Sequence, residues 1–117
     1  MFNSLKLWNI YYYPPGGTAN SPVDILYRLQ PIDQAKISHR LTTISELNKG
    51  QWPQKWVKFI SSIKLYQLRA DVYRIYFGIE NRDIIVCHIC RKTDQKAHKS
   101  DFKRAKDNFK RYLESQI

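Results

Sequence analysis

Residues 68–77 read Leu-Arg-Ala-Asp-Val-Tyr-Arg-Ile-Tyr-Phe, and residues 84–90 read Ile-Ile-Val-Cys-His-Ile-Cys. β-branched and aromatic residues dominate both runs, which is typical of strands. The strands that this pattern predicts cover Ile63–Arg69, Val72–Ile79 and Ile84–Cys90. Short polar connections at 70–71 and 80–83 join them. The pattern therefore predicts an antiparallel meander sheet.

Helices are predicted before this sheet. Between Asp33, a suitable N-cap, and Gly50, apolar residues recur at helical spacing, which predicts an amphipathic helix. Pro53 can open a second, shorter helix through Ile60, so that the two helices would form a hairpin. Further upstream, residues 2–13 suit a strand that Pro14 ends, and residues 23–29 fit a short strand or a helical turn.

The chain closes with a predicted amphipathic helix that Ser100 caps. Its apolar face would hold Phe102, Ala105, Phe109, Tyr112 and Leu113, and its other face Lys103, Arg104, Lys106, Lys110 and Arg111. The predicted fold class is therefore α+β, with a helical hairpin, a mainly meander antiparallel sheet and a C-terminal helix. We expect one domain over residues 1–117, with the helices on one side of the sheet and the opposite face free for a ligand.

The charge of the chain points to a polyanionic partner. Twenty Lys and Arg against ten Asp and Glu give a formal net charge of +10 over 117 residues. No apolar run approaches the roughly 18–20 residues that span a bilayer. The first residues also lack the unbroken apolar stretch of a signal peptide. Nucleic acid or an acidic protein is the favoured partner, and a cytoplasmic location without membrane contact is expected.

The cysteines and histidines do not predict a metal or cofactor site. Cys87 and Cys90 lie three apart in a predicted strand, which would place their side chains on opposite faces. We expect buried, reduced, structural thiols. His39, His88 and His98 fall on different predicted elements and the acidic residues are scattered, so no metal and no cofactor are expected.

One family resemblance is specific. Leu68-Arg69 is followed by Tyr73-Arg74-Ile75-Tyr76-Phe77, and then by an apolar strand that ends in Arg91-Lys92-Thr93. This pattern resembles the RelE superfamily of toxins from toxin–antitoxin systems, in particular its phage-derived HigB-like branch. The resemblance covers about residues 45–105 and does not explain residues 1–31. It implies a RelE-like fold and a toxin that cleaves messenger RNA on the ribosome.

The resemblance also implies roles for single residues. Arg74 falls at the phosphate-contacting position, Arg69 at the position that braces the sheet, and Arg91 and Lys92 at the basic end of the last strand. Some relatives place a tyrosine or a histidine near the C-terminal helix. In this chain only His98 or Phe102 falls at an equivalent position, so the identity of the general base stays open.

Elementary chemistry agrees with these residue types. RNA cleavage by its own 2′-hydroxyl needs a base, an acid, and cations for the phosphorane, and it needs no metal. The candidate catalytic set is Arg74, Lys92, Arg91 and His98. The candidate RNA-binding set is Arg69, Lys64, Lys96, Lys99, Lys103, Lys106, Lys110 and Arg111.

Two other classes of function stay open. A gyrase inhibitor of the ParE branch would share the fold without cutting RNA, and a non-catalytic nucleic-acid-binding module would explain the charge. The expected partners are messenger RNA on the ribosome and a small helix-turn-helix antitoxin resembling HigA. Arg74 could instead be an exposed strand residue that only aids solubility. The lysines of the last helix could likewise form only a solvated face without binding RNA.

Overall fold

A computed structural model describes residues 6–17, 21–92 and 99–116 of the chain. It confirms the α+β class. The elements in chain order are β1 (Asn9–Tyr12), α1 (Pro22–Tyr27), α2 (Pro31–Ser45), a 3-10 turn η1 (Lys49–Gln51), β2 (Val57–Ile60), β3 (Leu65–Ala70), β4 (Tyr73–Glu80), β5 (Asp83–Arg91) and α3 (Lys99–Ser115). Within the described ranges, no helix is long and apolar enough to cross a membrane.

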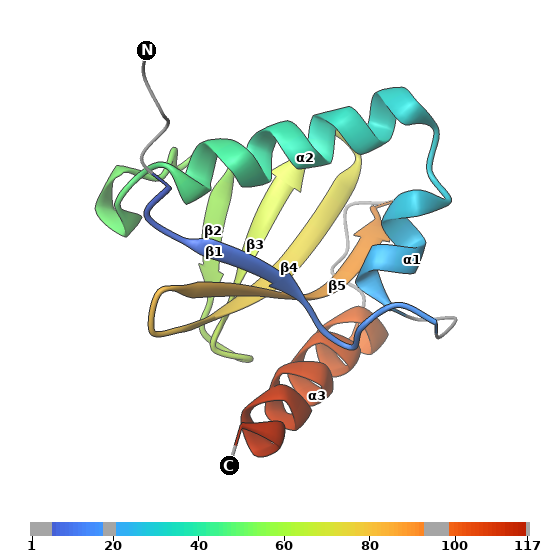
Figure 1. Ribbon diagram of the computed structural model, residues 1–117, viewed down its shortest axis with the longest axis vertical. Helices are drawn as coiled ribbons and strands as arrows, with labels where there is room; N and C mark the ends of the chain where they lie inside the picture. The colour runs from blue at the N-terminus through green and yellow to red at the C-terminus, as the bar shows by residue number, and fades with distance from the viewer. Residues whose placement is uncertain (1–5, 18–20, 93–98, 117) are drawn as a thin grey trace.

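The sheet has the strand order β1-β5-β4-β3-β2 (Figure 1). Strands β2 to β5 form the predicted antiparallel meander, and β1 pairs with β5 in parallel. The two tight connections begin at Asp71 and Asn81, which have φ angles of 58° and 56°. Short polar side chains tolerate this left-handed conformation, which suits a hairpin turn.

Helix α2 covers one face of the sheet, and it is the helix that the spacing of apolar residues predicted. Ile37, Leu41 and Ile44 are fully buried and pack with Ile75 and Phe77 of β4. After the helix, the indole N–H of Trp52 donates to the carbonyl oxygen of Ile44 at 2.9 Å, which closes this core at its end.

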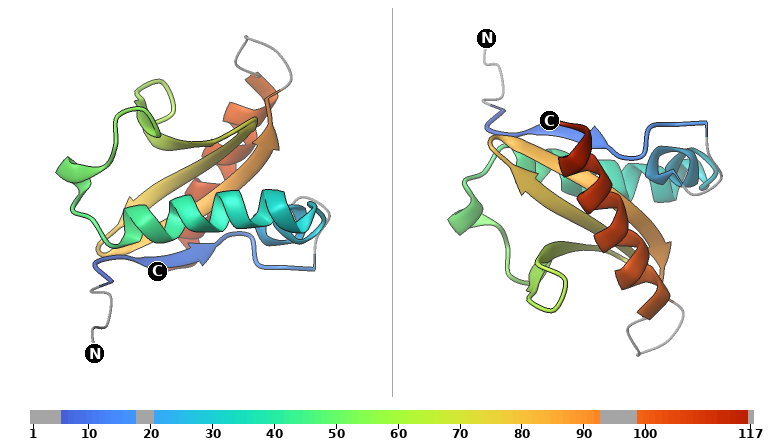
Figure 2. Two further views of the ribbon diagram at one scale, coloured as in Figure 1. Left: turned by 90° about the horizontal axis from the view of Figure 1, so that it is seen from above. Right: turned by 90° about the horizontal axis from the view of Figure 1, so that it is seen from below.

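Helix α3 covers the opposite face of the sheet, as the two turned views of Figure 2 show. Ala105 of α3 is buried against Tyr76, Ile85 and Cys87. The expectation that one face would stay free for a ligand was therefore wrong. The apolar stripe of α3 needs a surface to cover it, and this sheet face supplies one.

Residues 53–60 do not form the predicted second helix. Residues 57–60 are strand β2, which pairs with β3 in the register Val57 opposite Leu68. Pairing with a neighbouring strand outweighs the local helical signal of Pro53. Two consecutive helices still precede β2, because residues 22–27 form α1. Of the strand predicted over residues 2–13, the described part from residue 6 onward forms β1 at Asn9–Tyr12, and residues 2–5 lie outside the described residues.

Candidate functional site

Two arginines lie opposite each other on the α3 face of the sheet. Arg69 of β3 and Arg74 of β4 are direct partners in the strand register. Like charges in this position repel each other and destabilise a sheet. Among the described residues, no carboxylate forms an ion pair with either guanidinium. The pair is therefore a concentrated positive charge that has no ion-pair partner among the described residues.

The Arg74 side chain is held in place by the turn before its own strand. Its Nη1 atom donates to the carbonyl oxygens of Asp71 and Tyr73, both at 2.9 Å. Its Nε atom is buried and has no hydrogen-bond partner within residues 6–17, 21–92 and 99–116. Burial lowers the pKa of Arg74 and the charge of Arg69 lowers it further, but an arginine stays protonated in a protein. The result is a partly buried cation with unused donor capacity.

Next to this pair, three polar side chains connect β5 to the first turn of α3. The Nε2 atom of His88 lies 2.7 Å from the Oδ1 atom of Asp101. The Cys90 thiol also forms a hydrogen bond with the Asp101 side chain. Cys90 is the register partner of Arg74, which places the group beside the arginine pair. Burial lowers the pKa of His88, although Asp101 opposes this effect, so the imidazole is neutral at pH 7.

An irregularity in β5 brings these side chains together. Tyr76 pairs with His88 and Phe77 with Val86, so Cys87 has no partner and forms a β-bulge. The Nδ2 atom of Asn108, on α3, donates to the free carbonyl oxygen of Cys87 at 2.9 Å. The bulge turns both Cys87 and Cys90 toward the α3 face.

This bulge corrects the prediction that the two cysteines point to opposite faces. A regular strand alternates its side chains, and one extra residue reverses the alternation beyond it. Both thiols are free; Cys87 is buried, as predicted, whereas Cys90 is only half-buried. Burial raises the pKa of each thiol to about 12, and the nearby Asp101 contributes to this rise at Cys90.

Arg91 lies on the other face of the sheet. Its register partner is Tyr73, which belongs to the core under α2, and its charge acts on Asp71. The structure therefore places Arg91 and Arg74, both members of the candidate catalytic set, on opposite faces of the sheet, and the catalytic role of Arg91 stays a prediction. Lys92 directly follows β5 and is half-buried, and its backbone N–H donates to the carbonyl oxygen of Val72 at 2.7 Å.

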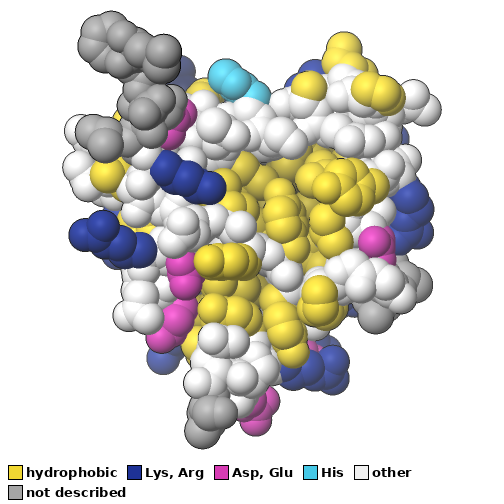
Figure 3. All heavy atoms as spheres, in the orientation of Figure 1, with side chains coloured by type: hydrophobic (Ala, Val, Ile, Leu, Met, Phe, Trp, Pro, Cys, Tyr) yellow, Lys and Arg dark blue, Asp and Glu magenta, His cyan; other side chains and the backbone are white. Residues whose placement is uncertain are grey.

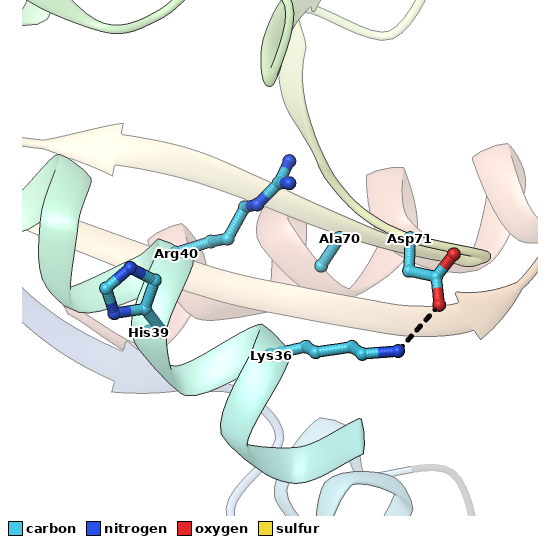
Figure 4. Close-up of a pocket in the computed structure, with 5 residues that line it drawn as sticks. All are labelled: Lys36, His39, Arg40, Ala70 and Asp71. Atoms are coloured by element: carbon cyan, nitrogen blue, oxygen red, sulfur yellow. Dashed lines mark hydrogen bonds and ion pairs between the residues drawn. The ribbon is translucent and has the colours of Figure 1, made fainter. Parts of the chain in front are cut away.

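A second basic region surrounds a pocket of about 480 Å³ between α2 and the β3–β4 turn (Figure 4). Lys36, His39 and Arg40 of α2 line it, and Lys36 forms an ion pair with Asp71 at 2.9 Å. Arg40 stacks over the Trp56 ring at 4.3 Å and donates to the carbonyl oxygen of Arg69. This pocket lies on the α2 face, as Arg91 does.

The predicted RNA-binding lysines gather along α3. Four lysines line a groove of about 650 Å³ between α3 and the turn before β3: Lys64, Lys103, Lys106 and Lys110. Lys103 is already paired with Asp107 at 2.7 Å. Lys99 and Arg111 are exposed on the same helix. Lys96 and His98 lie outside the described residues.

The view with β1 in front shows a different kind of surface. Hydrophobic side chains gather at the centre of this view, and Lys and Arg lie mainly at its edge (Figure 3). The positive charge that could meet a polyanion is thus not concentrated at the centre of this view.

Several polar residues of the site were not predicted. Gln67 donates to the Tyr76 hydroxyl at 3.1 Å beside the arginine pair, and His88 and Asp101 complete the group. A period-two reading of the strands could have placed Gln67 beside Arg69, since both lie on the same face. No sequence pattern predicts the contact between His88 and Asp101, because this contact depends on the β-bulge and on the packing of α3 against the sheet.

The fold and the arginine pair define a class. The protein is basic and has an α+β fold with a meander sheet and a C-terminal helix. This arrangement is consistent with the RelE-like fold. Residues 25–110 match the model of the phage-derived Gp49-like proteins (DUF891), so the chain belongs to that family. This family is related to the HigB/RelE-like toxins of toxin–antitoxin systems, which implies an antitoxin partner. No curated protein matches the sequence.

Proposed function

We propose that this protein is the toxin of a toxin–antitoxin pair and cleaves messenger RNA on the ribosome by attack of the RNA 2′-hydroxyl. The observation that carries the proposal is the Arg69–Arg74 pair. Two facing cations without a carboxylate cost stability, and a phosphate between them removes that cost. The proposed partners are messenger RNA on the ribosome and a helix-turn-helix antitoxin resembling HigA.

In the proposed reaction, the 2′-hydroxyl loses its proton to a base and its oxygen bonds to phosphorus, while the bond to the 5′-oxygen breaks and that oxygen takes up a proton from an acid. The phosphorane carries extra negative charge, so a preorganised guanidinium stabilises it more than it stabilises the bound substrate. Arg74 fits this role because the turn carbonyls hold it in place before RNA binds. Arg69 shares the phosphate, and Lys92 adds charge at the end of β5.

Other predicted residues take modified roles in the proposal. Arg91 contacts RNA from the other face of the sheet. His88 is 2% exposed and cannot reach a substrate directly. The identity of the proton acceptor stays open; His98, which belongs to the predicted catalytic set and lies outside the described residues, stays a candidate.

The test is primer extension on messenger RNA translated by purified ribosomes. The parent protein should produce cuts within codons, and Arg74→Ala should slow cutting by about 10²–10³-fold, the usual effect of losing one transition-state donor. Arg82→Ala is the matched control, because Arg82 is an exposed arginine at the opposite end of β4. It should change the rate less than about twofold.

The remaining outcomes separate the alternatives. Cutting that survives Arg74→Ala would mean that the site is misplaced. Absence of RNA cuts together with trapped gyrase–DNA complexes would identify a ParE-like inhibitor. Saturable RNA binding without cuts and without gyrase trapping would identify a binding module.

A further inference from the structure

Three side chains that bind transition metals lie together beside the arginine pair. His88 and Cys90 come from β5, and Asp101 comes from the first turn of α3. The potential ligand atoms, one from each side chain, all lie within 4.8 Å of one another. Nitrogen, thiolate and carboxylate together form a donor set that suits zinc, whereas magnesium and calcium prefer oxygen alone.

The spacing of these atoms is close to that of a tetrahedral site. Zinc lies about 2.0–2.3 Å from such ligands, which puts the ligand atoms roughly 3.4–3.6 Å apart. The present separations, from 2.7 Å between His88 and Asp101 up to 4.8 Å, bracket that range. Side-chain shifts of about one ångström would complete the coordination. Residues two apart on one strand share a face, so the β5 ligands need no change of backbone.

The protonation states also permit binding. The Nε2 atom of His88 lies 2.7 Å from the Asp101 carboxylate, so the neutral ring donates its Nε2 proton to Asp101. Binding of an ion replaces this hydrogen bond, and the ring proton moves to the buried Nδ1 atom, which has no hydrogen-bond partner among the described residues. The Nε2 atom is then unprotonated and can bind the ion. Cys90 must lose its proton to solvent on binding. The resulting thiolate and the Asp101 carboxylate balance the two charges of the ion, while Arg74 and Arg104 are the nearby cations.

The surroundings favour a defined site over loose surface binding. The His88 side chain is 3% exposed and that of Asp101 is 20% exposed, so the ion would be largely enclosed but still reached by water. The Tyr76 ring stacks on His88, and Phe102 packs edge-on against Tyr76. Three protein ligands and one open position are a common arrangement for zinc.

We propose that His88, Cys90 and Asp101 form a binding site for one Zn²⁺ ion, with water as the fourth ligand. The inference concerns binding and does not rest on the proposed RNA cleavage, which uses no metal in its chemical step. The ion links β5 to the start of α3, and it lies next to Arg74.

The test is titration of the full-length, reduced protein, free of any affinity tag, with Co²⁺ as a spectroscopic probe for zinc. A tetrahedral site with a thiolate should give visible d–d bands and a near-ultraviolet sulfur-to-cobalt band that saturate at one ion per chain. Added Zn²⁺ should abolish both. Cys90→Ser should eliminate the sulfur band, and Asp101→Asn should weaken binding by more than about tenfold.

Cys87→Ser is the matched control, because Cys87 is the buried neighbour that does not belong to the ligand group. It should keep the full spectrum. Circular dichroism of each variant establishes that it is folded. If Cys90→Ser unfolds, the parent protein still decides the matter, because absence of a stoichiometric sulfur band would overturn the site. A band that disappears in Cys87→Ser but persists in Cys90→Ser would also overturn it.

Discussion

Replacing Gly78 by alanine should displace α3 from the sheet. Gly78 lies in β4 and faces the Phe109 ring of α3. A Cβ atom at residue 78 would lie 2.3, 2.5 and 2.6 Å from three atoms of that ring. Ordinary contacts begin at 3.4 Å, so the ring must retreat by at least 3.4 − 2.3 = 1.1 Å.

The cost follows from what holds the ring in place. Phe109 stacks on Tyr112, and the adjacent Asn108 donates from a buried position to the Cys87 carbonyl oxygen. A shift of α3 large enough to clear the new methyl group would strain that bond. Overpacking of this kind costs about 1–3 kcal/mol. For a chain of this size, we expect the melting temperature to fall by about 4–12 °C.

Urea denaturation and thermal melting followed by circular dichroism measure this cost. Gly50→Ala is the control, because a Cβ atom at residue 50 meets nothing within 4 Å. It therefore reports only how a glycine-to-alanine change alters the conformational entropy of the unfolded chain. The double variant Gly78→Ala/Phe109→Ala should lose less stability than the sum of its single changes, since the clash has gone. If Gly78→Ala and Gly50→Ala agree within about 0.5 kcal/mol, the reasoning about α3 docking is refuted.

Further predictions concern the site. Cleavage should persist in EDTA and leave 2′,3′-cyclic phosphate and 5′-hydroxyl ends; a 5′-phosphate would indicate attack by water instead. Lys106→Ala combined with Lys110→Ala should flatten the salt dependence of RNA binding by about 1.4 log units, two contacts at roughly 0.7 each, and should leave cleavage at saturation unchanged. Lys92→Ala should do the reverse, lowering cleavage at saturation with affinity nearly intact; loss of affinity alone would argue against a role in chemistry. In a Cys90→Ser background, Cys87, whose pKa burial raises to about 12, should react with Ellman's reagent at pH 8 roughly a hundredfold more slowly in the folded than in the urea-unfolded protein, and equal rates would contradict its burial.

The sequence alone determined most of the regular structure, because its signals there are local. Strands β3, β4 and β5 follow from runs of β-branched and aromatic residues, and both tight turns follow from short polar connections. The period of apolar residues predicted α2 and α3. The order of residues from Leu68 to Thr93 resembles the RelE superfamily, and the comparison places the chain in the phage-derived Gp49-like family, which is related to those toxins.

Tertiary structure decided the features that depend on pairing between distant segments. Residues 57–60 became a strand because β3 offered an open edge, although Pro53 favours a helix locally. Helix α3 covered the face that was expected to be free, since its apolar stripe had no other surface to bury.

The candidate site depends even more on the tertiary structure. A single extra residue at Cys87 changes the alternation of β5, and the register with β4 then places Cys90 beside Arg74 and Arg91 on the opposite face. The position of a bulge is set by how two strands and a covering helix satisfy their buried backbone groups together, here through Asn108. No local pattern in the sequence carries that information, so the residue types of the site could be predicted but not which of them lie together.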